Sequence, residues 1–105
     1  MNAPVIRMSI GKFDPDKARA VESRLHDSRA RLEAGIRAMR GNLAYYVGID
    51  RTNHAMHNVS VWASVADANQ MATFAPMLAL AKEFTELGVR FDRPILNCET
   101  LWQFE

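Results

Sequence analysis

The order of strand-like and helix-like segments is the feature of this sequence that most constrains its fold. Strand-like segments are rich in β-branched and apolar residues, whereas helix-like segments repeat apolar residues every three or four positions. The segments follow one another in the order strand, helix, strand, strand, helix, strand. We expect strands over residues 5–13, 42–50, 54–64 and 95–104, and helices over residues 14–40 and 66–87.

Specific residues mark where the helices begin and end. Asp14 and Pro15 suit the N-cap and the first position of the first helix, and Gly41 suits the C′ position at its end. Pro76 interrupts the second helix, which we expect to resume as a separate segment that Gly88 ends.

A short polar turn over residues 50–53 joins the two middle strands into a hairpin. With this hairpin, the order of elements predicts an α+β, ferredoxin-like βαββαβ fold with an antiparallel four-stranded sheet. A chain of 105 residues has the length of one such domain, which we expect to span residues 1–105.

The hairpin predicts which residues share a face of the sheet, because directly opposed residues project to the same side. If the loop has two or four residues, residue 49 pairs with 54, 47 with 56 and 45 with 58, whereas a three-residue loop would scramble the faces. The first face then holds Leu43, Tyr45, Val47, Ile49, Met56, Asn58, Ser60 and Trp62, and the second holds Ala44, Tyr46, Gly48, Ala55, His57, Val59, Val61 and Ala63.

The second face predicts a partner. The helices of this fold cover only one face of the sheet, so the other face would expose Tyr46, Val59 and Val61 to water. Packing against the same face of a second copy would bury these side chains with twofold symmetry. We therefore expect a homodimer that forms through the open sheet face.

Composition argues against several classes of protein. The net charge of +1 gives no reason to expect a nucleic-acid partner. No apolar run approaches the roughly 20 residues that span a bilayer, and the N-terminus lacks a signal-peptide pattern, so we expect a soluble, cytoplasmic protein. Cys98 is the only cysteine, and His54 and His57 point to opposite faces of their strand, so we expect no metal site.

Asn58, Ser60 and Trp62 form the candidate site, since they follow one another at period two on one face of a strand. In the expected register, Tyr45 lies opposite Asn58, and His54 shares this face at the strand end. Their amide, hydroxyl, indole and phenol groups could bind a small, flat aromatic ligand. The same residues would also fit an ordinary core, in which buried Trp and Tyr are common.

In element order and length, the chain resembles the dimeric α/β-barrel superfamily. The stretch from Asn58 to Asn69, with Asn-x-x-x-Trp followed by Ser and a helix, resembles the antibiotic biosynthesis monooxygenase branch. This resemblance implies a cofactor-independent oxygenase of polycyclic phenols or anthrones. It further implies that Asn58 and Trp62 are catalytic residues that bind the substrate and stabilise its anion, while Tyr45, Ser60 and His54 stay candidates for substrate binding.

Haem-degrading enzymes of the same superfamily also need a helical His and an Asn on the first strand. Residues 66–88 contain no His and residues 5–13 contain no Asn, so we expect no cofactor. Two functions stay open at this point. One is a cofactor-independent monooxygenase acting on an electron-rich aromatic or quinol, and the other is a non-catalytic homodimer that binds a small ligand or serves a stress response.

Overall fold

The computed structural model describes residues 3–105 of the chain. Short 3₁₀ helices, η1 and η2, precede α1 and α3. The elements in chain order are β1 (Val5–Lys12), η1 (Pro15–Lys17), α1 (Ala18–Arg37), β2 (Asn42–Asp50), β3 (Ala55–Trp62), α2 (Val65–Ala68), η2 (Asn69–Thr73), α3 (Ala75–Glu86), β4 (Arg90–Phe91) and β5 (Leu96–Glu99).

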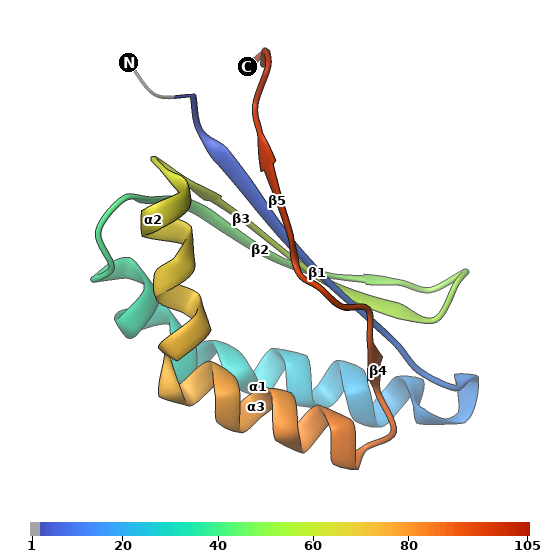
Figure 1. Ribbon diagram of the computed structural model, residues 1–105. Helices are drawn as coiled ribbons and strands as arrows, with labels where there is room; N and C mark the ends of the chain where they lie inside the picture. Colours follow the sequence, from blue (N-terminus) through green and yellow to red (C-terminus); the bar gives the residue numbers. More distant parts are fainter. Residues whose placement is uncertain (1–2) are drawn as a thin grey trace.

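The strands form one antiparallel sheet in the order β2-β3-β1-β4, and β5 also pairs with β1. Figure 1 shows α1 and α3 side by side on one face of this sheet, while no described element covers the other face. This arrangement confirms the predicted α+β, ferredoxin-like fold. Among the helices of residues 3–105, none is long and apolar enough to cross a membrane.

Helix α1 packs on the sheet through the apolar stripe that its sequence predicts, and Val21, Leu32 and Ile36 on this stripe are buried. The predicted helix start was wrong by a few residues, since η1 separates Asp14 from α1 and the Asp14 side chain caps neither helix. The carboxylate of Asp14 instead faces Arg90 at 3.4 Å.

The end of α1 also differs from the prediction. The helix ends at Arg37, and a turn follows before Gly41, which adopts the left-handed conformation expected of it (φ 76°). Gly41 therefore begins the connection to β2 and is not the C′ residue of the helix.

The hairpin register was predicted wrongly by two residues. Asp50 pairs with Ala55, Ile49 with Met56 and Tyr45 with Ser60, so residues 51–54 form a four-residue loop. The Asp50 carboxylate accepts hydrogen bonds from the Thr52 and Asn53 backbone amides at 3.1 and 3.0 Å, which stabilises the turn beyond the last strand pair. A shift of two residues preserves the side on which each side chain lies, so the two predicted faces hold from Ala44 to Ile49. A β-bulge between Asn42 and Ala44 places Asn42, and not Leu43, opposite Trp62.

The C-terminal third differs most from the prediction. Pro76 lies in the first turn of α3 as expected. The predicted strand over residues 95–104 is shorter, because β5 ends at Glu99 and residues 101–105 are exposed. A second short strand, β4, occupies part of the predicted loop and pairs with the other end of β1.

Gly41 supports a stability prediction. A Cβ atom there would overlap the carboxylate of Asp67, which is buried and accepts a hydrogen bond from Arg40 at 2.6 Å. Gly41→Ala should lower the free energy of unfolding in urea by about 1–3 kcal/mol, from the backbone conformation and the overlap together. Gly88→Ala is the matched control, because Gly88 has φ 95° but no atom within 4 Å of the added Cβ. Equal losses in both variants would contradict a role for the Asp67 contact.

Candidate functional site

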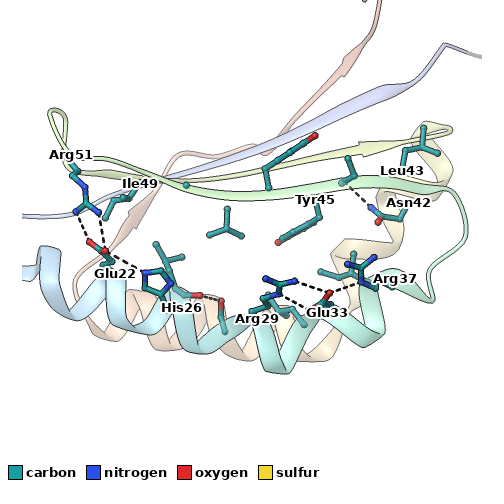
Figure 2. A pocket seen from close by; sticks show the side chains of 18 residues that line it. Glu22, His26, Arg29, Glu33, Arg37, Asn42, Leu43, Tyr45, Ile49 and Arg51 are labelled. Carbon is teal, nitrogen blue, oxygen red and sulfur yellow. Dashed lines mark hydrogen bonds and ion pairs between the residues drawn. The ribbon is translucent and has the colours of Figure 1, made fainter. Parts of the chain in front are cut away.

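A cleft of about 850 Å³ lies between α1 and the edge strand β2. Figure 2 shows side chains from both elements pointing into it, with charged groups along the helix side and Tyr45 on the strand side. The volume is in the range of small-molecule sites. Apolar side chains lining the cleft are Leu25, Leu32, Ile36, Leu43, Val47 and Ile49.

One end of the cleft is closed by an ion pair between the β2–β3 loop and α1. Arg51 donates to both carboxylate oxygens of Glu22, at 2.7 and 3.1 Å. The Arg51 hydrogen bond lowers the pKa of Glu22 and holds this carboxylate in its ionised form. His26 lies 3.6 Å from the same carboxylate and also lines the cleft.

A second charged group borders the cleft along α1. Glu33 accepts hydrogen bonds from Arg29 and Arg37, both at 2.8 Å and both one helical turn away. These hydrogen bonds lower the pKa of Glu33 to about 2, so two positive charges share one negative charge on this wall.

Tyr45 is the unusual group of the cleft. Its hydroxyl is buried and has no hydrogen-bond partner within residues 3–105. Burial raises the pKa of Tyr45 to about 12, so the phenol stays protonated at neutral pH and can donate a hydrogen bond. Buried polar groups are nearly always paired, so this hydroxyl is an exception, and a ligand in the cleft would reach it only if the Tyr45 side chain moved.

The structure separates the residues predicted for the site. Tyr45 lines the cleft, and Ser60 lies directly opposite it on β3. Trp62 is fully buried in the core, where its indole N–H donates to Ser60 Oγ at 2.8 Å. Trp62 therefore supports Ser60 from within the core and does not line the cleft.

Asn58 and His54 lie further along the hairpin. Asn58 pairs with Val47 and Ser9 on the helix-facing side, one step along the strand from Ser60, and its side chain is half-buried. His54 belongs to the loop, in a left-handed conformation (φ 53°), and its ring makes an edge contact with Phe13. The roles predicted for both residues stay predictions.

Sequence reasoning missed His26 as a candidate on the cleft wall. His26 belongs to an ordinary charged helix surface, and only the position of β2 above it turns that surface into a cleft wall. Arg7 faces the helices from the middle of β1, directly opposite Ser60, but neither residue lines the cleft. No group of three or more His, Cys, Asp or Glu side chains suited to a metal ion occurs in the described part of the chain.

No protein-family model matches the sequence, and no curated protein matches it at a significant level. Solved structures do share its fold. A Deinococcus radiodurans protein provisionally named an antibiotic biosynthesis monooxygenase is similar with a TM-score of 0.72 and 16% identity, over 96% of both chains. A Caulobacter crescentus protein with the same provisional name gives a TM-score of 0.72 and 16% identity, over 96% of this chain and 92% of the other.

A Pseudomonas aeruginosa protein is similar with a TM-score of 0.67 and 23% identity, over 97% of this chain and 98% of its own. These identities are low, so the similarity concerns the fold. At that level, the resemblance inferred from the sequence is confirmed.

Proposed function

We propose that this chain is a cofactor-independent monooxygenase that acts on a flat, electron-rich aromatic such as an anthrone or a quinol. The observation that carries the proposal is a cleft with apolar and charged walls that Tyr45 lines, where the buried Tyr45 hydroxyl has no hydrogen-bond partner within residues 3–105. A small movement of the Tyr45 side chain would let a substrate oxygen accept from this hydroxyl, while the rings of the substrate would contact the apolar side chains. The provisional names of proteins with the same fold support the same reaction class.

The reaction needs little from the protein beyond deprotonation and charge stabilisation. Loss of a proton from the CH₂ group of an anthrone gives an anion that can transfer an electron to O₂. Recombination gives a hydroperoxide, which loses water, so that CH₂ and O₂ become C=O and H₂O. The Tyr45 hydroxyl would donate to the oxygen on which the negative charge develops, with Asn58 as a second donor on the same face. Trp62 would act as a positioning residue through Ser60.

His26 is the proposed base. It is the one imidazole among the described residues that line the cleft, and histidine is the most frequent general base in enzymes. The neighbouring Glu22 would stabilise the imidazolium that forms when the substrate proton is taken up.

Tyr45→Phe tests the role of the phenol. We expect oxygen uptake with anthrone to fall about tenfold or more, which corresponds to the loss of one hydrogen bond to a charged oxygen. Thermal stability should not fall, because the hydroxyl makes no hydrogen bond within the described chain. Tyr46→Phe removes a hydroxyl from the neighbouring residue, which projects to the other face of the sheet, and should leave the rate unchanged. A drop in stability without a change in rate would assign Tyr45 to the fold instead.

A second function is favoured by the exposure of the proposed base. The His26 side chain is 80% exposed, so it would remove a substrate proton without the protection of a closed site. A non-catalytic protein that binds a small aromatic ligand in the same cleft fits this feature. Anthrone binding without oxygen uptake above the uncatalysed rate would favour that function over the monooxygenase.

We also propose that the chain forms a homodimer through the open sheet face. This face carries Val61 and Tyr46 of the hairpin, Ile6 and Met8 of β1, and Leu96 of β5. Tyr46 is 62% exposed in the single chain. A second copy offers a surface that is equally apolar and of matching shape, which supports a twofold interface.

A further inference from the structure

Residues 101–105 form an exposed, largely apolar segment that leaves the body of the protein. Thr100, just before it, is held to the sheet by a hydrogen bond from its backbone N–H to the Pro4 carbonyl at 2.9 Å. Figure 1 shows the chain continuing from β5 past the end of the sheet, away from α1 and α3. Leu101, Trp102 and Phe104 are 90%, 75% and 90% exposed. We call residues 101–105 the arm.

The aromatic residues of the arm argue for a protein partner. The rings of Trp102 and Phe104 meet edge to face, with their centroids 5.3 Å apart, so two large apolar side chains form one exposed cluster. Each aromatic side chain can bury about 150–250 Å². The arms of two copies could therefore bury several hundred Å², which is a large share of the roughly 1,600 Å² in a stable protein interface.

The opposite edge of the sheet offers a second exposed apolar surface. β2 pairs with β3 alone, so within residues 3–105 no strand lies along its outer edge. The β-bulge near Leu43 turns this side chain away from α1 and onto the open face, as Figure 2 shows. Leu43 is 59% exposed, and Tyr46 on the same face is 62% exposed. Lysine and proline often protect an edge strand from pairing, but β2 contains neither.

Twofold symmetry can bring these two surfaces together. If two sheets pack by their open faces about a twofold axis along the strands, the second copy has the reverse order of strands. β2 of one copy then lies across from β5 of the other, and the two strands run antiparallel. Glu99 at the end of β5 is level with Asn42 at the start of β2, because Val5 and Trp62 lie in line between them. The arm of one copy therefore begins close to Leu43 of the second copy.

We infer that the arm of one copy packs against the start of β2 in a second copy, with its aromatic rings on Leu43 and Tyr46. The inference rests on the proposed homodimer, since it names a contact that the two open faces alone do not make. It also specifies the direction of the symmetry axis. An axis across the strands would place the arm far from β2 of the second copy and leave its aromatic rings in water.

The test measures the dissociation constant of the dimer by sedimentation equilibrium. In the double variant Trp102→Ser with Phe104→Ser, the constant should rise at least about tenfold, because aromatic side chains dominate the binding energy of many interfaces. Leu43→Ser should also raise it. Adding Leu43→Ser to the arm variant should then have less effect than it has in the wild type, because the shared contact is already lost. Leu78→Ser is the matched control, at a leucine that is 54% exposed on α3, and should behave as the wild type.

The outcomes separate this inference from the proposed homodimer. A wild-type protein that stays monomeric at micromolar concentration would overturn both. A dimeric wild type with an unchanged dissociation constant in the arm variant would overturn the arm contact and leave the homodimer standing. A weaker arm variant would still contradict the contact with β2 if Leu43→Ser had no effect or the two effects multiplied in full. If the wild-type dimer does not dissociate at nanomolar concentration, the rate at which labelled copies exchange gives the same comparison.

Discussion

Replacing Trp62 with alanine is expected to destabilise the folded chain by about 3–5 kcal/mol, a large part of the stability of a domain of this size. Trp62 is fully buried and belongs to the same core cluster as Val5, Ile36 and Met71. Its removal leaves a cavity in a closely packed region and takes away the indole N–H that Ser60 accepts. Urea denaturation followed by circular dichroism would measure the loss.

Trp102→Ala is the matched control, because this second tryptophan is 75% exposed in the C-terminal segment. It should change the free energy of unfolding of the single chain by less than about 0.5 kcal/mol. The comparison also distinguishes the two interpretations of Trp62. If the indole served mainly as a stacking surface for a ligand, Trp62→Ala would weaken ligand binding and leave stability nearly unchanged. That result would contradict its placement in the core.

Most of the two hairpin faces could be predicted from sequence, because a register error of an even number of residues leaves each side chain on the same face. The predicted partner of Tyr45 was Asn58 and the observed partner is Ser60, yet both lie on the helix-facing side. The observed loop has four residues, one of the two predicted lengths, but it lies one residue further along the chain than predicted. Its position depends on Asp50, which stays paired in the strand while its carboxylate binds the turn amides.

Arg7 illustrates why the orientation of β1 could not be predicted from the sequence. Along β1, the apolar Ile6, Met8 and Ile10 alternate with Arg7 and Ser9. The usual interpretation of this alternation puts the apolar set toward the core and Arg7 in solvent. The structure has the opposite arrangement, in which the apolar set lies on the open face. If helices bury one face of the sheet and a second copy buries the other, both faces lie in an interior. The alternation of apolar and polar residues then no longer shows which face the helices cover.

A glutamate at Val61 is expected to prevent formation of the proposed homodimer. Val61 lies in the middle of the open face, between Ile6 on β1 and Ala44 on β2. In a twofold interface, Val61→Glu would bury one carboxylate from each copy without a cationic partner. Each buried charge costs about 3–5 kcal/mol, so the dissociation constant should rise by at least two orders of magnitude.

Light scattering coupled to size exclusion at micromolar concentration would measure this change. The wild type should have twice the 11.9 kDa mass of the chain, and Val61→Glu should have the mass of a single chain with an unchanged circular dichroism spectrum. Val65→Glu is the control, because Val65 is 51% exposed at the start of α2, where a carboxylate is favourable, and this variant should stay dimeric. A wild-type protein that is monomeric and well folded under these conditions would contradict the interface. In that case, no second copy would cover the apolar residues of β1 on the open face, and their position there would have no explanation.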